Sequence, residues 1–407
     1  MKTDQNKTFV GFGFGAIQGG LFLHEAFLSG HFKRLVVAEV VPDMVHAIRR
    51  NGGKYWVNIA TKTGIRKQEI SGIEIFNPAV AADRHALIAA IAEASEIGTA
   101  LPSVKFYTTG KEDDVASILA AGLKRKTEIA GSPRAIIYTA ENHNHAAEIL
   151  AAEISRKVAH HHAILETCQA LNTVIGKMSG VVTDAQQMAA QSLAPITTGM
   201  PRALLVEEFN RILITRIRWS DFDCGIRVFE EKDDLLPFEE AKLYGHNATH
   251  ALIGYLLQRK GCKLMSDAAK NPDVMKIARE AFIAESGAAL CKQRAGVDPL
   301  FTPEGFARYA DDLLERMMNP YLQDAVERIT RDPRRKLGWN DRLVGTMRIV
   351  LEQGITPTRY AMGAAAALAT LQAESGGDAG ELLDAIWQED HADEKIRQQI
   401  RKLILEA

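Results

Sequence analysis

The sequence has few of the features that mark a secreted, membrane-bound or nucleic-acid-binding protein. Its 407 residues include four cysteines, at positions 168, 224, 262 and 291, and no C-x-x-C pair. A structural zinc site built on cysteine is therefore not expected. The formal net charge is −2, which gives no electrostatic reason to expect nucleic acid or an anionic membrane as a partner.

Long apolar runs are also missing, so no membrane-spanning segment is expected. Residues 1–7 lead directly into a strand-like segment without a signal-peptide pattern, which predicts a cytoplasmic protein. The histidines at 143 and 145 would diverge on a helix, and the run at 160–162 would spread around one turn. We interpret these histidines as a solvated surface and expect no metal site.

The composition is that of a globular protein with a sizeable core, since 46% of the residues are hydrophobic and 25% are charged. A chain of 407 residues exceeds one typical core, so two domains are expected. Strands alternate with helices up to about residue 230, which predicts a Rossmann-like, doubly wound α/β sheet domain over 1–230. Helical periodicity dominates afterwards and predicts a mostly α-helical domain over 231–407.

The first strand, over residues 8–12, is followed by a glycine-rich turn of the kind that binds a dinucleotide. Gly13 and Gly15 let the backbone approach a pyrophosphate, and the following helix offers N–H donors at its N-terminus. Gln18 stands where the third glycine of a G-x-G-x-x-G pattern would be. Its close-packing role can pass to Gly19 or Gly20.

The end of the second strand, over residues 34–40, carries an acid at the expected place for a ribose contact. Glu39 follows Gly19 by 20 residues; its carboxylate can accept from the ribose diol and repel a 2′-phosphate, which favours NAD over NADP. The alternative is a surface glutamate at a strand end. A further strand, over 97–102, is expected to end at the cofactor. The cofactor-binding residues expected from this pattern are Gly13, Gly15, Ala16, Ile17, Glu39, Thr99 and Ala100.

Two further features of the first domain carry expectations. Segments 55–59 and 73–76 look like a pair of strands inserted in the sheet. An apolar strand over 134–140 ends at Asn142, and a helical run follows from about 144 to 171. Asn142 can point its amide at a substrate, because strand C-termini build the site of open α/β sheets. It can also be the N-cap of the following helix.

The second domain opens with a stretch that offers an amine, an amide and an imidazole. If the chain is α-helical here, Lys242 and His250 lie about 80° apart around the helix axis, and Asn247 about 60° from His250. A buried lysine can lose its proton near neutral pH and act as a base. An asparagine amide can donate to a developing alkoxide. On spacing alone, an ordinary helix with a solvated lysine is the alternative.

Two patterns resemble the long-chain polyol dehydrogenase family. One is the spacing Lys-x4-Asn-x2-His at 242–250, and the other is NPYLQDAVERITRDPRRKLGWNDRLV at 319–344, which is similar to the mannitol-1-phosphate 5-dehydrogenase branch. The resemblance implies metal-independent hydride transfer between NAD and a polyol or ketose, with mannitol 1-phosphate and fructose 6-phosphate favoured. It implies that Lys242 is the base, that Asn142 and Asn247 hold the reacting oxygen, and that His250 orients the substrate or Lys242. Glu239 or Glu240 would pass the proton to solvent.

Several alternatives remain open. Hexonate oxidoreductases acting on tagaturonate or fructuronate, and dehydrogenases of free mannitol, share the lysine motif, and a non-catalytic NAD-binding sensor is a remote alternative. We expect a monomer or homodimer that binds a small polyol or sugar phosphate. Basic side chains that could meet a substrate phosphate are Arg331, Arg334, Arg335 and Arg342. Their alternative role is structural, in ion pairs with Asp332 and Asp341.

Overall fold

A computed structural model describes residues 6–158, 162–388 and 393–407. The chain divides into two compact units, Met1–Leu235 and Leu236–Ala407. His160 and His161 of the histidine run lie outside the described residues. None of the described helices is long and apolar enough to cross a membrane.

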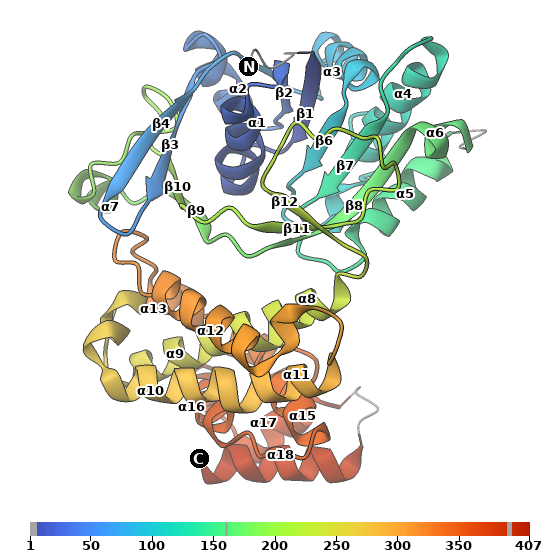
Figure 1. The fold of residues 1–407 in the computed structure, drawn as a ribbon. Helices are drawn as coiled ribbons and strands as arrows, with labels where there is room; N and C mark the ends of the chain where they lie inside the picture. Colours follow the sequence, from blue (N-terminus) through green and yellow to red (C-terminus); the bar gives the residue numbers. More distant parts are fainter. Residues whose placement is uncertain (1–5, 159–161, 389–392) are drawn as a thin grey trace. The chain divides into compact units, whose positions relative to one another are not determined.

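The N-terminal unit is built on an eight-stranded sheet with the order β12-β11-β8-β7-β6-β1-β2-β5 (Figure 1). All neighbouring pairs are parallel except β8 and β11. This confirms the predicted doubly wound α/β fold. The strands are β1 (Lys7–Phe12), β2 (Phe32–Ala38), β5 (Ile73–Phe76), β6 (Glu96–Thr99), β7 (Ala135–Thr139), β8 (Cys168–Ile175), β11 (Ile212–Thr215) and β12 (Phe229–Lys232).

The strand order reverses at β1, which lies between β2 on one side and β6 on the other. After β1 the chain builds outward through β2 and β5, and then returns to start the other half of the sheet at β6. Open α/β sheets bind their ligands outside the carboxyl ends of the strands at such a switch point. The topology therefore directs attention to the residues that follow β1, β2 and β6.

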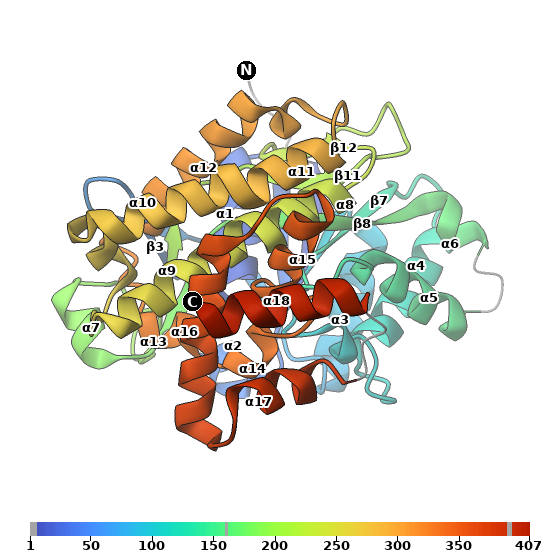
Figure 2. The same cartoon turned by 90° about the horizontal axis from the view of Figure 1, so that it is seen from below.

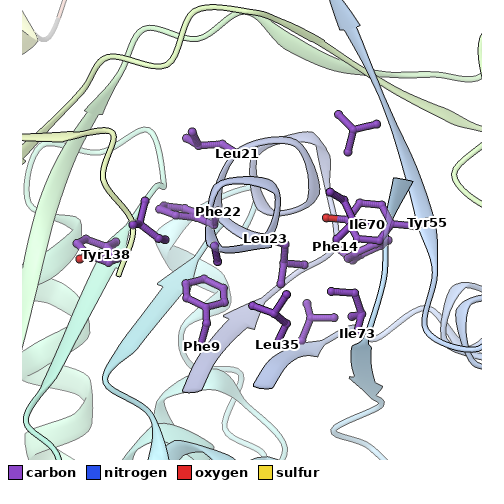
Figure 3. Close-up of a cluster of buried hydrophobic side chains, with 14 of the residues drawn as sticks. Phe9, Phe14, Leu21, Phe22, Leu23, Leu35, Tyr55, Ile70, Ile73 and Tyr138 are labelled. Carbon is purple, nitrogen blue, oxygen red and sulfur yellow. The ribbon is translucent and has the colours of Figure 1, made fainter. Parts of the chain in front are cut away.

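Helices cover both faces of this sheet, and the side chains of each strand alternate between them. Phe9 of β1 packs with the helix segment after the first strand, whereas Val10 packs on the opposite face. Phe22 lies between Phe9 and Tyr138, with ring centroids 6.3 and 6.1 Å away (Figure 3). The helices of this unit are η1 (Gln18–Phe22), α1 (Leu23–Ser29), α2 (Pro42–Arg50), α3 (Ala81–Glu93), η2 (Val104–Phe106), α4 (Val115–Glu128), α5 (Ala146–Lys157), α6 (His162–Thr167) and α7 (Ala185–Ala190).

A second, four-stranded sheet has the order β4-β3-β10-β9, with β3 at Tyr55–Ala60, β4 at Ile65–Ile70, β9 at Ser179–Val182 and β10 at Ala203–Glu207. The predicted pairing of segments 55–59 and 73–76 is wrong. β3 pairs with β4 and β10 in this second sheet, whereas β5 is the edge strand of the main sheet beside β2. β4 is polar and partly exposed, so its sequence lacks the apolar pattern of a buried strand.

The helical run predicted up to residue 171 is also wrong. The helices end at Thr167, and Cys168–Ile175 forms β8, which pairs in parallel with β7. Its residues gain the ladder hydrogen bonds and a buried position at Leu171. Tertiary pairing therefore overrides the helical propensity of the segment.

The C-terminal unit is all-helical apart from one isolated bridge between Leu264 and Ala325, within the described residues. Helix α9 packs against α16, α13 and α10, and α18 packs against α15, α16 and α17 (Figure 2). Gly363 of α16 allows this close packing, because a Cβ there would lie 2.8 Å from Leu252 Cδ1. The helices are α8 (Leu236–Glu240), η3 (Ala241–Asn247), α9 (Ala248–Arg259), η4 (Met265–Lys270), α10 (Pro272–Glu280), η5 (Ala281–Gly287), α11 (Ala288–Gln293), η6 (Pro299–Phe301), α12 (Pro303–Met317), α13 (Val326–Thr330), α14 (Pro333–Lys336), α15 (Val344–Glu352), α16 (Thr358–Ser375), α17 (Ala379–Ile386) and α18 (Glu394–Glu406).

Candidate active site

The turn after β1 joins three strand ends at one glycine. Gly13 has a φ of 81°, in the left-handed region that favours glycine. Its N–H donates to Ala38 O at the end of β2 over 2.9 Å. A Cβ on Gly13 would lie 2.9 Å from Ala100 O, just after β6. Because Gly13 has no side chain, the backbone after β1 can lie close to the ends of β2 and β6 at the switch point.

The side chain of Gln18, in the following helix, packs over Gly11. This glycine lies two residues before Gly13, where the glycine pattern was expected to begin. A Cβ on Gly11 would lie 2.1 Å from Nε2 of Gln18, a fully buried side chain. Counted from Gly11, the pattern Gly11-x-Gly13-x-x-Ala16 matches the alanine form of the dinucleotide fingerprint, G-x-G-x-x-A. In this frame the third position is Ala16, whereas the frame that begins at Gly13 places Gln18 there.

The remaining residues of the turn leave the backbone accessible. A Cβ on Gly15 would meet nothing within 4 Å, so this glycine is not required by protein packing. The helix begins at Ala16 and Ile17, and the first-turn N–H groups of a helix have no intrahelical acceptor. An anion that approaches Gly15 could be bound by such donors. Gly13, Gly15, Ala16 and Ile17 therefore form one continuous segment suited to a pyrophosphate.

Gly19 and Gly20 do have a packing role, but against the second sheet. A Cβ on Gly19 would lie 2.7 Å from Leu204 Cδ1, and one on Gly20 would lie 2.4 Å from Val206 Cγ1. Tyr55 donates its hydroxyl hydrogen to Gly19 O over 2.7 Å. Strands β3 and β10 therefore fix the helix that carries the turn.

Glu39 binds the same turn through its carboxylate. Its Oε2 accepts a hydrogen bond of 2.8 Å from Phe14 N, and its Oε1 accepts one of 2.8 Å from Val41 N. Both oxygens keep further acceptor capacity. The acid expected to meet the ribose is therefore also a clamp between the turn and the end of β2.

A pocket beside Glu39 is basic. It is formed by α2 and residues 199–202, and it begins at Val41. Arg49 is committed to the Asp83 carboxylate over 2.7 Å. The charged and titratable lining residues are Asp43, His46, Arg49, Arg50 and Arg202.

Of the two residues expected at the end of β6, only Ala100 has exposed surface. Thr99 is fully buried, and its hydroxyl donates to Glu141 Oε2 over 2.9 Å. Glu141 Oε1 also accepts from Leu101 N over 2.9 Å, and Tyr107 donates to Oε2. Glu141 therefore binds the ends of β6 and β7 together, and Thr99 supports this network rather than a ligand.

Asn142 follows this clamp and is exposed, with no hydrogen bond to the described residues. The N-cap alternative is wrong, because α5 begins at Ala146 and His145 occupies the N-cap position. The first turn of α5 is capped instead by Asn172, whose Oδ1 accepts from Ala147 N over 2.9 Å. The amide of Asn142 thus remains available at the C-terminal end of β7.

In the C-terminal unit, the expected α-helix through the lysine motif is wrong. Residues Ala241–Asn247 form a π-helix, and α9 begins only at Ala248. Residues five apart, such as Lys242 and Asn247, would be about 140° apart in an α-helix of 3.6 residues per turn. Because π-helical hydrogen bonds run from i to i+5, they place these two residues one above the other. The π-helix therefore brings the amine and the amide to one side.

A close packing contact accompanies this π-helix. A Cβ on Gly245 would lie 2.8 Å from Phe282 Cε2, on the second π-helix of the unit, η5. π-helical turns inside α-helices are frequent at functional sites, so the π-helix at Lys242 is compatible with a functional role. Local sequence preferences do not distinguish them from α-helices, which explains the incorrect expectation.

The environment of Lys242 favours the neutral amine. Burial lowers its pKa from 10.5 to about 8. Glu239 opposes this shift, and Arg342 adds to it. Glu240 is committed elsewhere, because Arg294 donates to its Oε2 over 2.8 Å. Of the two glutamates, Glu239 is therefore the one that is coupled to Lys242.

His250 meets a carboxylate that was not singled out from the sequence. Its Nε2 lies 3.2 Å from Asp324 Oδ2. His246, one turn before it, is buried, and burial lowers the pKa of His246 well below 6.5. Asp324 belongs to the family-like segment 319–344. Its contact with His250 joins residues 74 positions apart, and such a contact leaves no local pattern in the sequence.

The basic segment is largely engaged in ion pairs. Arg335 Nε lies 2.9 Å from Asp332 Oδ2, and Arg342 Nε lies 2.8 Å from Asp341 Oδ1. The structural alternative therefore applies to both of these arginines. Arg331 and Arg334 are exposed and form no ion pair with the described residues. Across residues 6–158, 162–388 and 393–407, no cluster of three or more His, Cys, Asp or Glu could hold a metal ion.

Comparisons with known proteins show which families the chain resembles. Residues 234–407 match the family model described as mannitol dehydrogenase C-terminal domain. The chain is 36% identical over 137 residues to mannitol-1-phosphate 5-dehydrogenase of Halalkalibacterium halodurans. That match covers 34% of this chain and 35% of the relative, so it spans about a third of the relative's length. The resemblance inferred from the sequence motifs is confirmed.

Solved structures extend the likeness of fold to nearly the whole chain. Pseudomonas fluorescens mannitol 2-dehydrogenase, in a ternary complex with NAD and D-mannitol, has a TM-score of 0.71 at 15% identity, covering 99% of this chain and 92% of that one. A substrate-free D-sorbitol dehydrogenase has a TM-score of 0.74 at 14% identity, covering 99% and 93%. These two likenesses show a shared fold.

Proposed function

We propose that the chain is an NAD-dependent dehydrogenase that interconverts a polyol and its ketose without a metal ion. Mannitol 1-phosphate and fructose 6-phosphate are the favoured pair. The observation that carries the proposal is Lys242, an amine with a pKa of about 8 on the same π-helix as Asn247. A group with such a pKa can take a proton and return it near neutral pH.

The N-terminal unit has the features that a dinucleotide needs. The turn from Gly13 to Ile17 offers an accessible backbone and a helix N-terminus to the pyrophosphate, and Glu39 offers acceptors to the ribose hydroxyls. Bound NAD supplies the hydride acceptor, at C4 of its nicotinamide. Ala100 is expected to carry the backbone contact at the end of β6.

The C-terminal unit supplies the proton chemistry. In polyol oxidation, Lys242 Nζ takes the hydroxyl proton while the hydride leaves the same carbon. Asn247 donates to the oxygen and stabilises its partial negative charge. Glu239 then passes the proton from Lys242 to solvent. Ketone reduction reverses each of these roles.

Substitution of Lys242 tests this assignment. We expect Lys242→Ala to lower turnover by about a thousandfold, within the usual range for a general base, and to leave NADH binding unchanged. Lys276→Ala, at an exposed lysine of α10, is the matched control and should keep full turnover. Wild-type-like turnover in Lys242→Ala would rule out the base assignment.

The substrate class has a second candidate, a free polyol or a hexonate. It is favoured by the ion pairs of Arg335 and Arg342, which already neutralise two of the four basic groups expected at a phosphate. NADH oxidation with fructose 6-phosphate, fructose, tagaturonate and fructuronate side by side separates the candidates. Clear preference for fructose 6-phosphate supports the phosphorylated substrate, and preference for any other member of this panel replaces it. No turnover with the whole panel, despite NADH binding, favours the sensor alternative.

A further inference from the structure

The imidazole of His250 has its buried nitrogen against Asp324. Nε2 has no solvent exposure, and Asp324 Oδ2 lies 3.2 Å from it. The side chains are 13% and 10% exposed. Among the described residues Nε2 has no well-aligned hydrogen bond, and its contact with Oδ2 is one of ion-pair distance. A buried polar nitrogen needs a partner, and a small rotation of the imidazole would align Nε2–H with the Asp324 carboxylate at this distance.

The position of Asp324 is fixed by its backbone. Asp324 O accepts from Met265 N over 2.8 Å, and Val326 N donates to Lys263 O over 2.9 Å. Between these two bonds lies the isolated antiparallel bridge of Leu264 and Ala325. The segment that carries Asp324 is thus attached to the chain that follows α9, the helix of His250.

The side chain of Asp324 is fixed as well, with one oxygen for each partner. Oδ1 accepts from Arg328 Nε over 2.8 Å and lies 2.6 Å from Arg328 Nη2, whereas Oδ2 faces His250. Burial opposes ionisation of Asp324, but the contacts with His250 and Arg328 lower its pKa below 3.8. The carboxylate is therefore ionised at neutral pH and oriented before any ligand binds.

A carboxylate beside one ring nitrogen determines the state of the other. When Nε2–H faces an ionised acceptor, a neutral imidazole keeps its hydrogen on Nε2. Nδ1 is then a bare acceptor, and it has no hydrogen bond to the described residues. A polyol offers hydroxyl groups beside its reacting carbon, and such a hydroxyl can donate to Nδ1.

Building on the proposed function, we infer that Asp324 is a positioning residue that holds His250 with Nδ1 free to accept a hydrogen bond from a substrate hydroxyl. The other titratable and charged groups near His250 and Asp324 do not take the place of this carboxylate. The His246 ring lies 6.2 Å from that of His250. Arg316, Lys242 and Arg342 all disfavour a charge on His246. Asp324 is the carboxylate that meets His250 directly, and Arg328 holds it.

The first test measures the tautomer and needs no activity. Protein labelled with 15N-histidine is studied by NMR with NADH bound, and His250 is assigned by loss of its signal in His250→Ala. We expect Nε2–H in the wild type, and a mixture of tautomers in Asp324→Asn, whose amide can also donate to Nε2. Asp311→Asn, at an exposed aspartate paired with Arg279 in the same unit, should leave the signal unchanged. A wild-type His250 with its proton on Nδ1 would overturn the inference, whether or not any variant folds.

The second test measures kcat/KM with the preferred polyol. We expect Asp324→Asn to lower kcat/KM by about tenfold to a hundredfold, the usual effect of losing a group that orients a functional histidine. The loss should disappear when the substitution is added to His250→Ala, since Asp324 acts through His250. If the two substitutions together lower kcat/KM by the product of their separate factors, Asp324 has a general structural effect and the inference is refuted. If the wild type has no activity with any polyol, the proposed function fails, and the tautomer test still decides the role of Asp324.

Discussion

The backbone N–H of Phe14 donates to the carboxylate of Glu39 over 2.8 Å, which joins the glycine turn after β1 to the end of the neighbouring strand. This contact gives Glu39 two separable roles. Its hydrogen bonds hold the turn in shape, and we propose that its charge repels a 2′-phosphate. A substitution that removes both roles would therefore confuse loss of the turn with loss of cofactor discrimination.

Glu39→Gln separates them, since the amide oxygen still accepts one of the two backbone N–H groups. We expect the preference for NAD over NADP to fall by about tenfold or more, equal to about 1.4 kcal/mol, because the repulsion is lost beside a basic pocket. Glu39→Ala should show the same change and weaker binding of both cofactors. Titration of NADH and NADPH by fluorescence measures both effects. Unchanged discrimination in Glu39→Gln would remove Glu39 from the ribose site.

Gly13 and Gly15 form a matched pair for the turn itself. Gly13→Ala should destabilise the fold by roughly 1–3 kcal/mol, because alanine is strained at a φ of 81° and its Cβ would meet Ala100 O at 2.9 Å. Gly15→Ala should leave the unfolding midpoint unchanged, since nothing lies within 4 Å of its Cβ. If the pyrophosphate passes over Gly15, the same substitution weakens NADH binding. Stable protein with normal NADH affinity would place the cofactor elsewhere.

The fold was largely predictable because the main signals are local. The glycine turn between Val10 and Leu21, the acid at Glu39 and the apolar strand before Glu141 follow patterns of a few residues each. The failures were of another kind. β8 is a strand because it pairs with β7, and β4 is polar because one side of it is exposed, so neither has a clear local pattern.

The candidate site was less predictable for the same physical reason. Lys242, Asn247 and His250 were found from their spacing, but the π-helix that determines their relative directions leaves no pattern in the sequence. Asp324 and the ion pairs of Arg335 and Arg342 depend on tertiary neighbours. The first turn of α5 is capped by Asn172, which lies in β8 and 30 positions after Asn142, the residue proposed as the N-cap.

Burial of Lys242 should cost stability, which a change to methionine tests. Lys242 has a pKa of about 8 in the native state and about 10.5 in the unfolded chain. Between these pH values unfolding therefore binds a proton. The free energy of unfolding of the wild type rises with pH in this range. We expect Lys242→Met to be more stable by about 1–2 kcal/mol at pH 7, after allowance for partial solvent exposure. The advantage should shrink towards pH 10. Urea unfolding at both pH values checks this, and equal stability at pH 7 would argue against a buried charge.

Arg331 and Arg334 are the basic groups left for a substrate phosphate. If they bind it, Arg331→Ala and Arg334→Ala should each raise KM for mannitol 1-phosphate by about tenfold, the effect of one charged hydrogen bond, and leave KM for free mannitol unchanged. Arg308→Ala, at an exposed arginine of α12, is the control. Equal effects on both substrates would exclude a phosphate contact.

The pH dependence of polyol oxidation tests the role of Lys242 most directly. Oxidation requires the neutral amine, so kcat/KM for the preferred polyol should rise between pH 6 and 9 with a midpoint near 8, the pKa of Lys242. Ketone reduction requires the protonated amine and should fall through the same midpoint. Lys242→Ala should lose this dependence together with most of its activity. A wild-type oxidation rate that stays flat or falls from pH 7 to 9 would contradict Lys242 as the base.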